Sequence, residues 1–220
     1  MKLPYVVAAV VFDMDGLLFD TETLHQEAIT AAAEESGYQM TPAFSRRMIG
    51  CAWSVNRALL LSRYGNTFEV EEFRTSWQRH FDQRVVGRVP LKPGATELLD
   101  TLDELQLPRA IATSSIRLVV QRHLMAHGLA DRFHEIVADG DYKVSKPAPD
   151  PFLNAAERLG VEPRLCLALE DSYSGIQSAS AAGMMTVMVP DLLEPTDEIR
   201  ELCIAVVHNL HEVRKLILES

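Results

Sequence analysis

Two carboxylates one residue apart, Asp13 and Asp15, directly follow an apolar, valine-rich run over residues 6–12. Side chains two positions apart in an extended chain point the same way, so both acids are expected on one side of the backbone. Such a pair can hold a divalent cation, or act as a nucleophile and a general acid/base. The simpler alternative is an acidic turn after a strand, because Asp and Gly are common turn residues.

Further polar groups end, or follow shortly after, three later apolar runs. They are Thr113, Ser114, Lys146, Glu170 and Asp171. Each has a simpler interpretation when taken singly. Thr113 and Ser114 could cap the N-terminus of a helix, Lys146 could be an ordinary surface lysine, and Glu170 and Asp171 could lie in a solvated turn. Taken together with the first pair of acids, they bring excess negative charge to one place, which is costly unless a cation is present.

The types of these residues indicate which ligands such a site would take. Hard carboxylate ligands without a nearby His or Cys cluster favour Mg²⁺. Thr113, which is expected at the start of a helix, and the backbone N–H groups beside it offer donors to a phosphate. Lys146 adds a positive charge. The set predicts a phosphoryl group held between a carboxylate and Mg²⁺.

Helices and strands alternate along most of the chain, and they must position these residues. Residues 21–85 show helical periodicity without a convincing strand, and the aromatic spacing between Val70 and Phe81 is typical of core packing. After a break at 91–94, strands are expected at 109–113, 135–138, 165–169, 185–189 and 204–207, and helices at 95–105, 118–127, 151–159, 175–182 and 210–218. This order predicts an α/β fold: a Rossmann-like, doubly wound parallel sheet with a helical module inserted after its first strand. Ligands bind beyond the carboxyl ends of such strands.

Composition narrows the classes of partner. The chain has 220 residues, 47% of them hydrophobic, and a formal net charge of −10. An acidic surface repels nucleic acid and anionic membranes, so neither is expected as a partner. Cys51, Cys166 and Cys203 form no Cys-x-x-Cys pair, and the first apolar run is too short to span a bilayer. We therefore expect a cytoplasmic protein.

Four motifs in a fixed order point to a known family. They are Phe-Asp-Met-Asp-Gly-Leu-Leu at 12–18, Ala-Thr-Ser at 112–114, Lys-Pro at 146–147 and Glu-Asp-Ser at 170–172. With these motifs spread over essentially its whole length, the chain resembles the haloacid dehalogenase superfamily of phosphohydrolases. Within it, the chain is most similar to the β-phosphoglucomutase-like branch, which has a helical cap.

The resemblance implies a role for each matching residue. Asp13 would be the nucleophile that forms an aspartyl-phosphate, and Asp15 the general acid/base. The Mg²⁺ ligands would be Asp13, the backbone carbonyl of Asp15, and Asp171, with Glu170 in support. Thr113, the Ser114 amide and Lys146 would hold the phosphoryl oxygens, and His25 matches a cap-hinge histidine.

The resemblance also implies a division of the chain and a substrate class. Residues 1–18 and 89–220 would form the core domain, and residues 19–88 the cap that closes over the substrate. The implied activity is hydrolysis of a small phosphorylated metabolite, either a sugar phosphate or a nucleoside monophosphate. One alternative is an inactive binding protein on the same fold, although none of the matching catalytic residues is missing.

A second alternative is a sugar phosphate mutase. Mutases of this branch grip a second phosphate with a Lys and an Arg of a cap loop. Ile49 and Trp53 occupy those places here, which favours a hydrolase in which Trp53 contacts the leaving group. Compensation by Arg46, Arg47 or Arg57 would restore the mutase interpretation.

Overall fold

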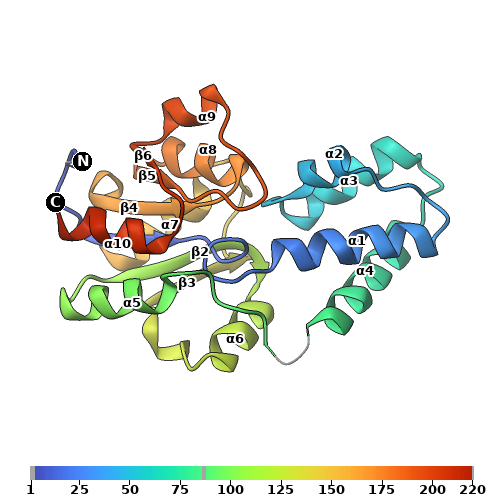
Figure 1. The fold of residues 1–220 in the computed structure, drawn as a ribbon. Coiled ribbons are helices and arrows are strands. Elements are labelled where there is room, and N and C mark those ends of the chain that lie inside the picture. The colour runs from blue at the N-terminus through green and yellow to red at the C-terminus, as the bar shows by residue number, and fades with distance from the viewer. Residues whose placement is uncertain (1–2, 86–87, 220) are drawn as a thin grey trace.

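A six-stranded parallel sheet forms the centre of the molecule (Figure 1). The computed structural model describes residues 3–85 and 88–219. The strands lie in the order β3-β2-β1-β4-β5-β6. They are β1 (Ala9–Phe12), β2 (Arg109–Ile116), β3 (Glu135–Asp139), β4 (Cys166–Glu170), β5 (Met185–Met188) and β6 (Ala205–Val206). The predicted α/β class and parallel sheet are confirmed.

The first strand lies between β2 and β4, and this position builds the site. Phe12, its last residue, is paired with Ile111 on one side and with Leu169 on the other. The backbone N–H of the next residue, Asp13, still donates to the Leu169 carbonyl at 3.0 Å. The residues that follow these three strand positions therefore meet at one edge of the sheet, as the strand order requires.

Side chains alternate between the two faces of the sheet along β1, and they are apolar on both faces. Helices therefore cover both faces. Val10 and Phe12 belong to one buried apolar cluster, and Ala9 and Val11 belong to another. The helices α5 (Ala95–Glu104), α6 (Arg117–Ala126) and α10 (Leu210–Leu218) pack on the first cluster, and α7 (Asp150–Leu159) and α8 (Tyr173–Ala181) on the second. A further short helix, α9 (Asp197–Leu202), was not predicted.

The described part of the segment between β1 and α5 forms four α-helices and a short 3-10 helix (Arg46–Met48), which lie to one side of the sheet in Figure 1. The α-helices are α1 (Glu22–Glu35), α2 (Pro42–Ser45), α3 (Trp53–Tyr64) and α4 (Val70–Arg84), and we call them the helical insert. They have an apolar cluster of their own, which includes Ile29, Leu60 and Phe73. No extended strand is found in the described part of this segment, as predicted.

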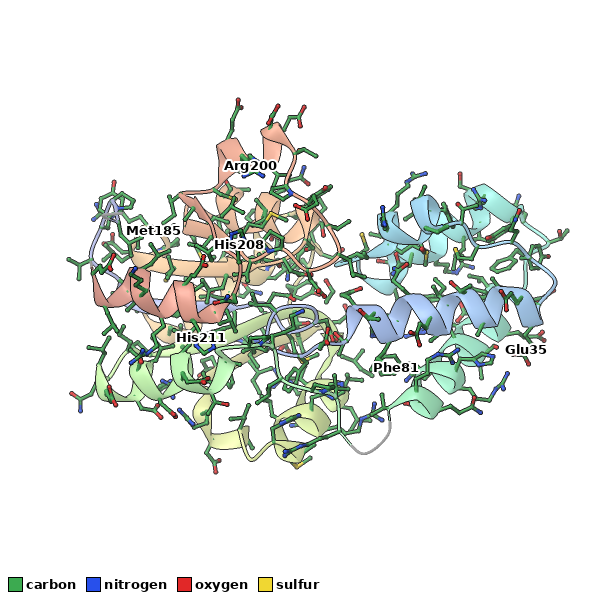
Figure 2. The ribbon with its side chains drawn as sticks, in the orientation of Figure 1. Glu35, Phe81, Met185, Arg200, His208 and His211 are labelled. Atoms are coloured by element: carbon green, nitrogen blue, oxygen red, sulfur yellow. The ribbon has the colours of Figure 1, made fainter. Side chains whose placement is uncertain are left out.

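Two contacts show how α1 and α4 are joined along their length. At the outer end of the insert, Glu35 accepts hydrogen bonds from Ser76 at 2.6 Å and contacts the His80 ring nitrogen at 2.9 Å (Figure 2). Near the sheet, the Phe81 ring of α4 stacks on the His25 ring of α1 with 4.0 Å between centroids, and Phe81 is buried within the apolar cluster of the core. The predicted aromatic stripe is therefore core for most of its length, but Trp77 is only half buried.

Three predicted boundaries differ from the structure. Val6 is 80% exposed and β1 begins at Ala9, so only the end of the first apolar run is strand. β2 continues to Ile116 because its pairing with β3 resumes there after an irregularity. Thr113 consequently lies in a strand, and the prediction of a helix start at this residue is wrong. The N-cap of α6 is Ile116, which makes no side-chain cap bond.

None of the helices in residues 3–85 and 88–219 has both the length and the apolar composition to cross a membrane.

Candidate active site

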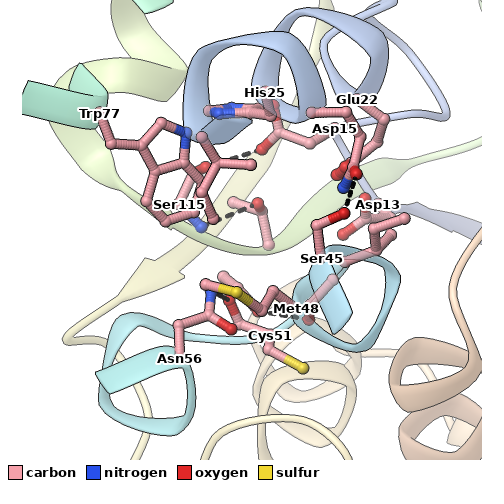
Figure 3. Close-up of a pocket in the computed structure, with 16 residues that line it drawn as sticks. Asp13, Asp15, Glu22, His25, Ser45, Met48, Cys51, Asn56, Trp77 and Ser115 are labelled. Carbon is pink, nitrogen blue, oxygen red and sulfur yellow. Dashed lines mark hydrogen bonds between the residues drawn. The ribbon is translucent and has the colours of Figure 1, made fainter. Parts of the chain in front are cut away.

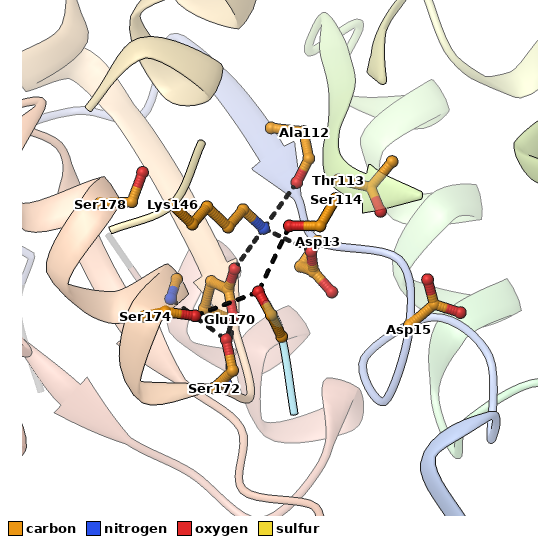
Figure 4. Close-up of polar contacts among 12 residues, drawn as sticks. Asp13, Asp15, Ala112, Thr113, Ser114, Lys146, Glu170, Ser172, Ser174 and Ser178 are labelled. Atoms are coloured by element: carbon orange, nitrogen blue, oxygen red, sulfur yellow. Dashed lines mark hydrogen bonds and ion pairs between the residues drawn. The ribbon is translucent and has the colours of Figure 1, made fainter. Parts of the chain in front are cut away.

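Lys146 lies at the centre of the site and connects three of the strand ends (Figure 4). Its ammonium group donates to Asp13 Oδ1 at 2.5 Å, to Glu170 Oε1 at 2.6 Å and to the Ala112 carbonyl at 2.9 Å. The lysine side chain is only 1% exposed, so these contacts replace water completely. Three donors and three acceptors hold the head group in one position.

Glu170 is held by hydrogen bonds at both of its oxygens. Its Oε2 accepts from the Asp171 and Ser172 amides at 3.0 and 3.1 Å, and from Ser172 Oγ at 2.9 Å. Ser172 is also the N-cap of α8, and its Oγ accepts from the Gly175 amide at 3.1 Å. A Cβ at Gly175 would lie 1.7 Å from Glu170 Oε1, so only glycine leaves room for the carboxylate.

Asp13, Glu170 and Asp171 together fit a hard cation. Each offers a carboxylate oxygen, and the three oxygens lie within 4.8 Å of one another. Oδ2 of Asp171 is buried and has no hydrogen-bond partner among the described residues. A Cβ at Gly16 would lie 2.3 Å from this oxygen, so the backbone approaches it closely. An all-oxygen donor set with one unsatisfied oxygen matches the preferences of Mg²⁺.

The pKa shifts of Asp13 and Asp171 also favour a bound cation at this cluster. Burial raises the pKa of Asp13 to about 8, against the lowering effect of Lys146, and Glu170 and Asp15 add to the rise. Burial and the negative charge of Glu170 also raise the pKa of Asp171 well above its ordinary value. One lysine does not offset this many buried acids, and a bound cation would favour their charged forms.

A cavity of about 140 Å³ opens beside Asp13 and extends between the sheet edge and the helical insert (Figure 3). We call it the first cavity. Its walls include Asp13, Asp15, Glu22, His25, Ile49, Asn56, Trp77, Thr113, Ser114 and Ser115. The carboxylate of Asp15 accepts from Ser115 Oγ at 2.7 Å, which holds it at the cavity wall and not in the Lys146 cluster. The described metal-ligating cluster does not include the Asp15 side chain.

Ser114 and its neighbour on α8 join the insert to the core. Ser114 Oγ donates to the Gly50 carbonyl at 3.3 Å, and Ser174 Oγ donates to the same carbonyl at 3.1 Å. Gly50 has a φ of +69°, and a Cβ there would lie 2.4 Å from Ser172 Oγ. The loop before α3 therefore rests directly on β2 and on the start of α8. Thr113 Oγ1 accepts from the Ser115 amide at 3.1 Å.

The two site residues predicted in the insert lie in different surroundings. His25 lines the first cavity, and its ring stacks on Phe81 with 4.0 Å between centroids. Burial lowers the pKa of His25, which favours the neutral imidazole. Trp53 is absent from the walls of the first cavity. It lines an adjoining second cavity of about 180 Å³, where the Arg74 guanidinium lies 4.6 Å from its ring centroid.

Sequence reasoning gave no site role to several residues that face the first cavity, among them Glu22, Asn56, Trp77 and Ser115. Glu22 lies four residues after the end of the first motif, and an acid so close to the motif was a signal in the sequence. In the structure its carboxyl group is buried, and burial together with four nearby acids raises its pKa. Trp77 was interpreted only as core, because helical spacing does not reveal which part of a stripe faces a cavity. Ser115 belongs to the polar Thr-Ser-Ser run at 113–115 but was given no role of its own, and Asn56 carried no signal in the sequence.

The sequence pattern of the haloacid dehalogenase-like hydrolases matches residues 10–189. The chain belongs to this family. It is 36% identical over 219 residues to Protein CbbY of Cupriavidus necator, covering 91% of this chain and 85% of that protein. It is 33% identical to a phosphorylated carbohydrates phosphatase of Thermotoga maritima, covering 80% and 82%, and 31% identical to the fructose-1-phosphate phosphatase YqaB of Escherichia coli, covering 83% and 96%.

A solved structure supports the fold independently. The β-phosphoglucomutase of Clostridium difficile superposes with a TM-score of 0.80 at 22% identity, covering 97% of this chain and 98% of that one. At this identity the likeness concerns the fold alone. With the named phosphatases among the relatives, the protein is a phosphoric monoester hydrolase of the haloacid dehalogenase type. The alternative of an inactive binding protein is set aside.

Proposed function

We propose that the protein is a Mg²⁺-dependent phosphatase that hydrolyses a small phosphorylated metabolite through a phosphoryl group carried by Asp13. The single observation that carries this proposal is the Lys146 ammonium, which donates to Asp13 at 2.5 Å and to Glu170 at 2.6 Å beside the unpartnered oxygen of Asp171. A buried ammonium group, a carboxylate and an unpaired carboxylate oxygen therefore lie side by side, next to a cavity that Asp13 lines.

In the first half of the reaction, Asp13 attacks the phosphorus atom of the substrate. Lys146 binds Oδ1 of Asp13, which leaves Oδ2 for the attack. As the new P–O bond forms, the bond from phosphorus to the leaving-group oxygen breaks. Asp15 donates a proton to that oxygen, and its contact with Ser115 holds it near the cavity wall where the leaving group emerges.

In the second half, the roles of the carboxylates reverse. Asp15, now ionised, takes a proton from a water molecule, whose oxygen attacks the phosphorus. The P–O bond to Asp13 breaks, and inorganic phosphate leaves. We assign Lys146, Thr113 and the Ser114 amide as donors to the phosphoryl oxygens, with Lys146 exchanging one of its three present acceptors for the phosphoryl group. Mg²⁺ held by Asp13, Glu170, Asp171 and the Asp15 backbone carbonyl would supply positive charge that stabilises the negative oxygens.

The helical insert serves as the cap in this proposal. Residues 19–88 form the cap, and residues 1–18 and 89–220 form the core domain. Support comes from the separate apolar cluster of the insert and from the two serines that bind the Gly50 carbonyl. His25 and Trp53 line the space between the two parts, and closure there would exclude water from the phosphoryl group.

Sugar phosphates and nucleoside monophosphates are the proposed substrate classes, and the proposed location is the cytoplasm. Relatives named for phosphorylated carbohydrates and fructose 1-phosphate support the first class. The acidic net charge of −10 argues against nucleic acid and membranes as partners.

The test of the nucleophile is Asp13→Asn. We expect release of phosphate from p-nitrophenyl phosphate with Mg²⁺ to fall to background, while circular dichroism and the melting temperature show an intact fold. Asp15→Asn is the matched comparison, and its rate should fall by about 10²–10⁴-fold because only proton transfer is lost. A beryllium fluoride adduct found on any residue other than Asp13 would contradict the proposed mechanism.

A second experiment separates hydrolysis from mutase activity. The first cavity has no Lys or Arg among its described wall residues, and Ile49 lies in its wall. Arg57 pairs with Glu71, Arg47 lies over the Phe44 ring, and Arg46 lines a different cavity, so none of the three lines the first cavity. With β-glucose 1-phosphate we therefore expect inorganic phosphate, with no requirement for glucose 1,6-bisphosphate. Formation of glucose 6-phosphate faster than phosphate would favour the mutase.

A further inference from the structure

Tyr142 is a partly buried side chain near the phosphate site that the mechanism above does not use. It lies in the loop that follows β3, and its ring packs against the apolar cluster under α7 and α8. Its hydroxyl donates a hydrogen bond to the Thr113 carbonyl at 3.2 Å. Lys146, from the same loop, donates to the neighbouring Ala112 carbonyl at 2.9 Å (Figure 4). Two side chains of one loop therefore bind two successive carbonyls near the end of β2.

Regular pairing of β2 with β3 is interrupted where Tyr142 makes this contact. Ala112 is paired with Val137 of β3. The next pair is Ile116 with Asp139, so four steps along β2 lie opposite two steps along β3. Backbone groups within such an irregularity lose their regular partners and need others. The Tyr142 hydroxyl is such a partner for a carbonyl in this interval.

The polar residues within the interruption also make contacts of their own. The Ser115 amide donates to Thr113 Oγ1 at 3.1 Å. Ser114 Oγ donates to the Gly50 carbonyl at 3.3 Å. The contact of Tyr142 differs from these two, because it acts on the peptide unit that joins Thr113 to Ser114. The N–H of that unit is the Ser114 amide, which is assigned above as a donor to the phosphoryl oxygens.

The geometry of a peptide unit links the Tyr142 contact to the direction of that amide. A peptide unit is planar, and in a trans unit the carbonyl and the N–H point in opposite directions. The unit between Thr113 and Ser114 is trans. Both residues line the first cavity, whereas the described walls of that cavity do not include Tyr142. With its carbonyl directed at Tyr142, the unit therefore directs the Ser114 N–H away from the loop and towards the cavity.

The Tyr142 hydroxyl remains a hydrogen-bond donor at neutral pH. Burial raises the pKa of Tyr142 to about 12, and the charge of Asp139 adds to the rise, while Lys146 acts in the opposite direction. A neutral phenol carries the proton that the contact with the Thr113 carbonyl requires.

We propose that Tyr142 is a positioning residue, whose hydroxyl holds the peptide unit between Thr113 and Ser114 so that the Ser114 N–H is aimed at a phosphoryl oxygen. The proposal rests on the phosphatase function proposed above. A donor that is already oriented needs no rearrangement when the phosphoryl group arrives, which is the basis of electrostatic stabilisation by backbone amides. Without the hydroxyl, the peptide unit is free to rotate and its N–H is correctly aimed for only part of the time.

The first measurement observes the Ser114 amide directly in the wild-type enzyme with Mg²⁺. Labelling threonine with ¹³C at the carbonyl and serine with ¹⁵N restricts a carbonyl-to-amide correlation spectrum to Thr-Ser pairs. The sequence contains Thr113–Ser114 and one other such pair, Thr75–Ser76, which lies on α4 and serves as an internal reference. We expect saturating inorganic phosphate to shift the Ser114 amide proton downfield and to leave the Ser76 signal in place. A Ser114 signal that does not respond to bound phosphate would overturn the proposal.

The second measurement assigns this orientation to the hydroxyl. Tyr142→Phe removes one oxygen atom, so the Thr113 carbonyl signal should move and the response of the Ser114 amide to phosphate should shrink. The Kd for inorganic phosphate, measured by calorimetry, should rise by at least about tenfold. Tyr64→Phe is the matched control, because it removes a tyrosine hydroxyl that donates to the Gln39 carbonyl at 2.9 Å within the insert. It should change none of these quantities.

A rescue variant separates the hydrogen bond from packing of the ring. Replacing Tyr142 with 4-aminophenylalanine keeps the ring and restores a donor, so phosphate affinity and the response of the Ser114 amide should return towards wild type. Wild-type phosphate affinity in folded Tyr142→Phe would overturn the proposal. A folded 4-aminophenylalanine protein with affinity as low as that of Tyr142→Phe would also overturn it.

The outcomes separate this proposal from the one on which it rests. If the wild-type enzyme binds no phosphate and releases none from p-nitrophenyl phosphate, the phosphatase proposal itself fails. If it cleaves p-nitrophenyl phosphate in an Asp13-dependent way but Tyr142→Phe behaves as wild type, only the role of Tyr142 fails.

Discussion

At the scale of single residues, the site depends on one lysine and several acids that share a small volume. Lys146 binds Asp13 and Glu170, but Asp171 keeps one oxygen without a partner. Taking charges out of water is costly, so the acids that Lys146 does not neutralise need another positive charge. Asp171 is the residue on which the proposed cation should depend most, since its free oxygen has no other function in the structure.

The corresponding prediction is that Asp171→Asn weakens Mg²⁺ binding by at least about tenfold, the range seen when groups around a metal are altered. Isothermal titration calorimetry of Mg²⁺ measures this directly, and the Mg²⁺ concentration for half-maximal phosphate release gives a second reading. Asp131→Asn, at an exposed acid, is the control. Unchanged Mg²⁺ affinity in the Asp171 variant would rule out this residue as a ligand.

At the scale of elements, the start of α8 determines how Glu170 is placed. The helix begins directly after β4, and its N-cap Ser172 binds both the Gly175 amide and the Glu170 carboxylate. The turn is so tight that a Cβ at Gly175 would lie 1.7 Å from the carboxylate. Gly175 has no positive φ, so the requirement for glycine comes from packing and not from the backbone conformation.

We therefore predict that Gly175→Ala displaces Glu170 or the first turn of α8. Overpacking of this kind typically costs about 1–3 kcal/mol, despite the better helix propensity of alanine. Urea unfolding measures the loss, and phosphate release should fall with it because Glu170 no longer meets Lys146. Gln177→Ala lies on the exposed side of the same helix and should change neither quantity. A Gly175→Ala protein of wild-type stability and activity would show that the helix start adapts.

At the scale of the whole molecule, the helical insert and the core meet around His25. Its ring stacks on Phe81, which belongs to the apolar cluster of the core. Burial lowers the pKa of His25 from its ordinary value of 6.5, while the charge of Asp15 acts in the opposite direction. The unfolded chain therefore binds a proton at a higher pH than the folded protein does, which links the stability of this junction to pH.

The sign of the effect follows from that difference. As pH falls below about 6.5, the unfolded state gains protons first, so His25 lowers the free energy of unfolding until the pH reaches the lowered pKa of the folded state. Asp13, with a pKa raised to about 8, acts in the opposite direction: its stabilising contribution is lost as pH rises towards 8. The comparison must therefore be between wild type and His25→Phe.

We predict that wild type loses stability relative to His25→Phe between pH 7 and pH 5. The slope of the difference is at most about 1.4 kcal/mol per pH unit for one group. Denaturant unfolding at several pH values measures it, and a variant of the exposed His208 serves as the control. If the difference in free energy of unfolding between wild type and His25→Phe does not vary with pH, His25 has the same pKa in the folded and unfolded states.

The sequence by itself determined the sheet, the order of its elements and the residues at its edge. Apolar runs and turn residues are local signals, and parallel topology then brings the ends of β1, β2 and β4 together without further information. The sequence therefore predicts that Asp13, Lys146, Glu170 and Asp171 lie together. The end of β2 was misplaced because its pairing with β3 resumes at Ile116, and that pairing is not local.

The tertiary structure alone decided what faces the opening above those residues. Asn56 and Trp77 lie on different helices, and only the packing of the insert on the sheet brings them to one cavity. The same packing places Trp53 in the second cavity, and it leaves one polar atom each on Asn56 and Trp77 without a partner. Contacts between distant segments depend on how whole elements pack, and periodicity within one element carries no record of them. The residues at the edge of the sheet could therefore be predicted from motifs, whereas the walls of the cavity above them required the fold.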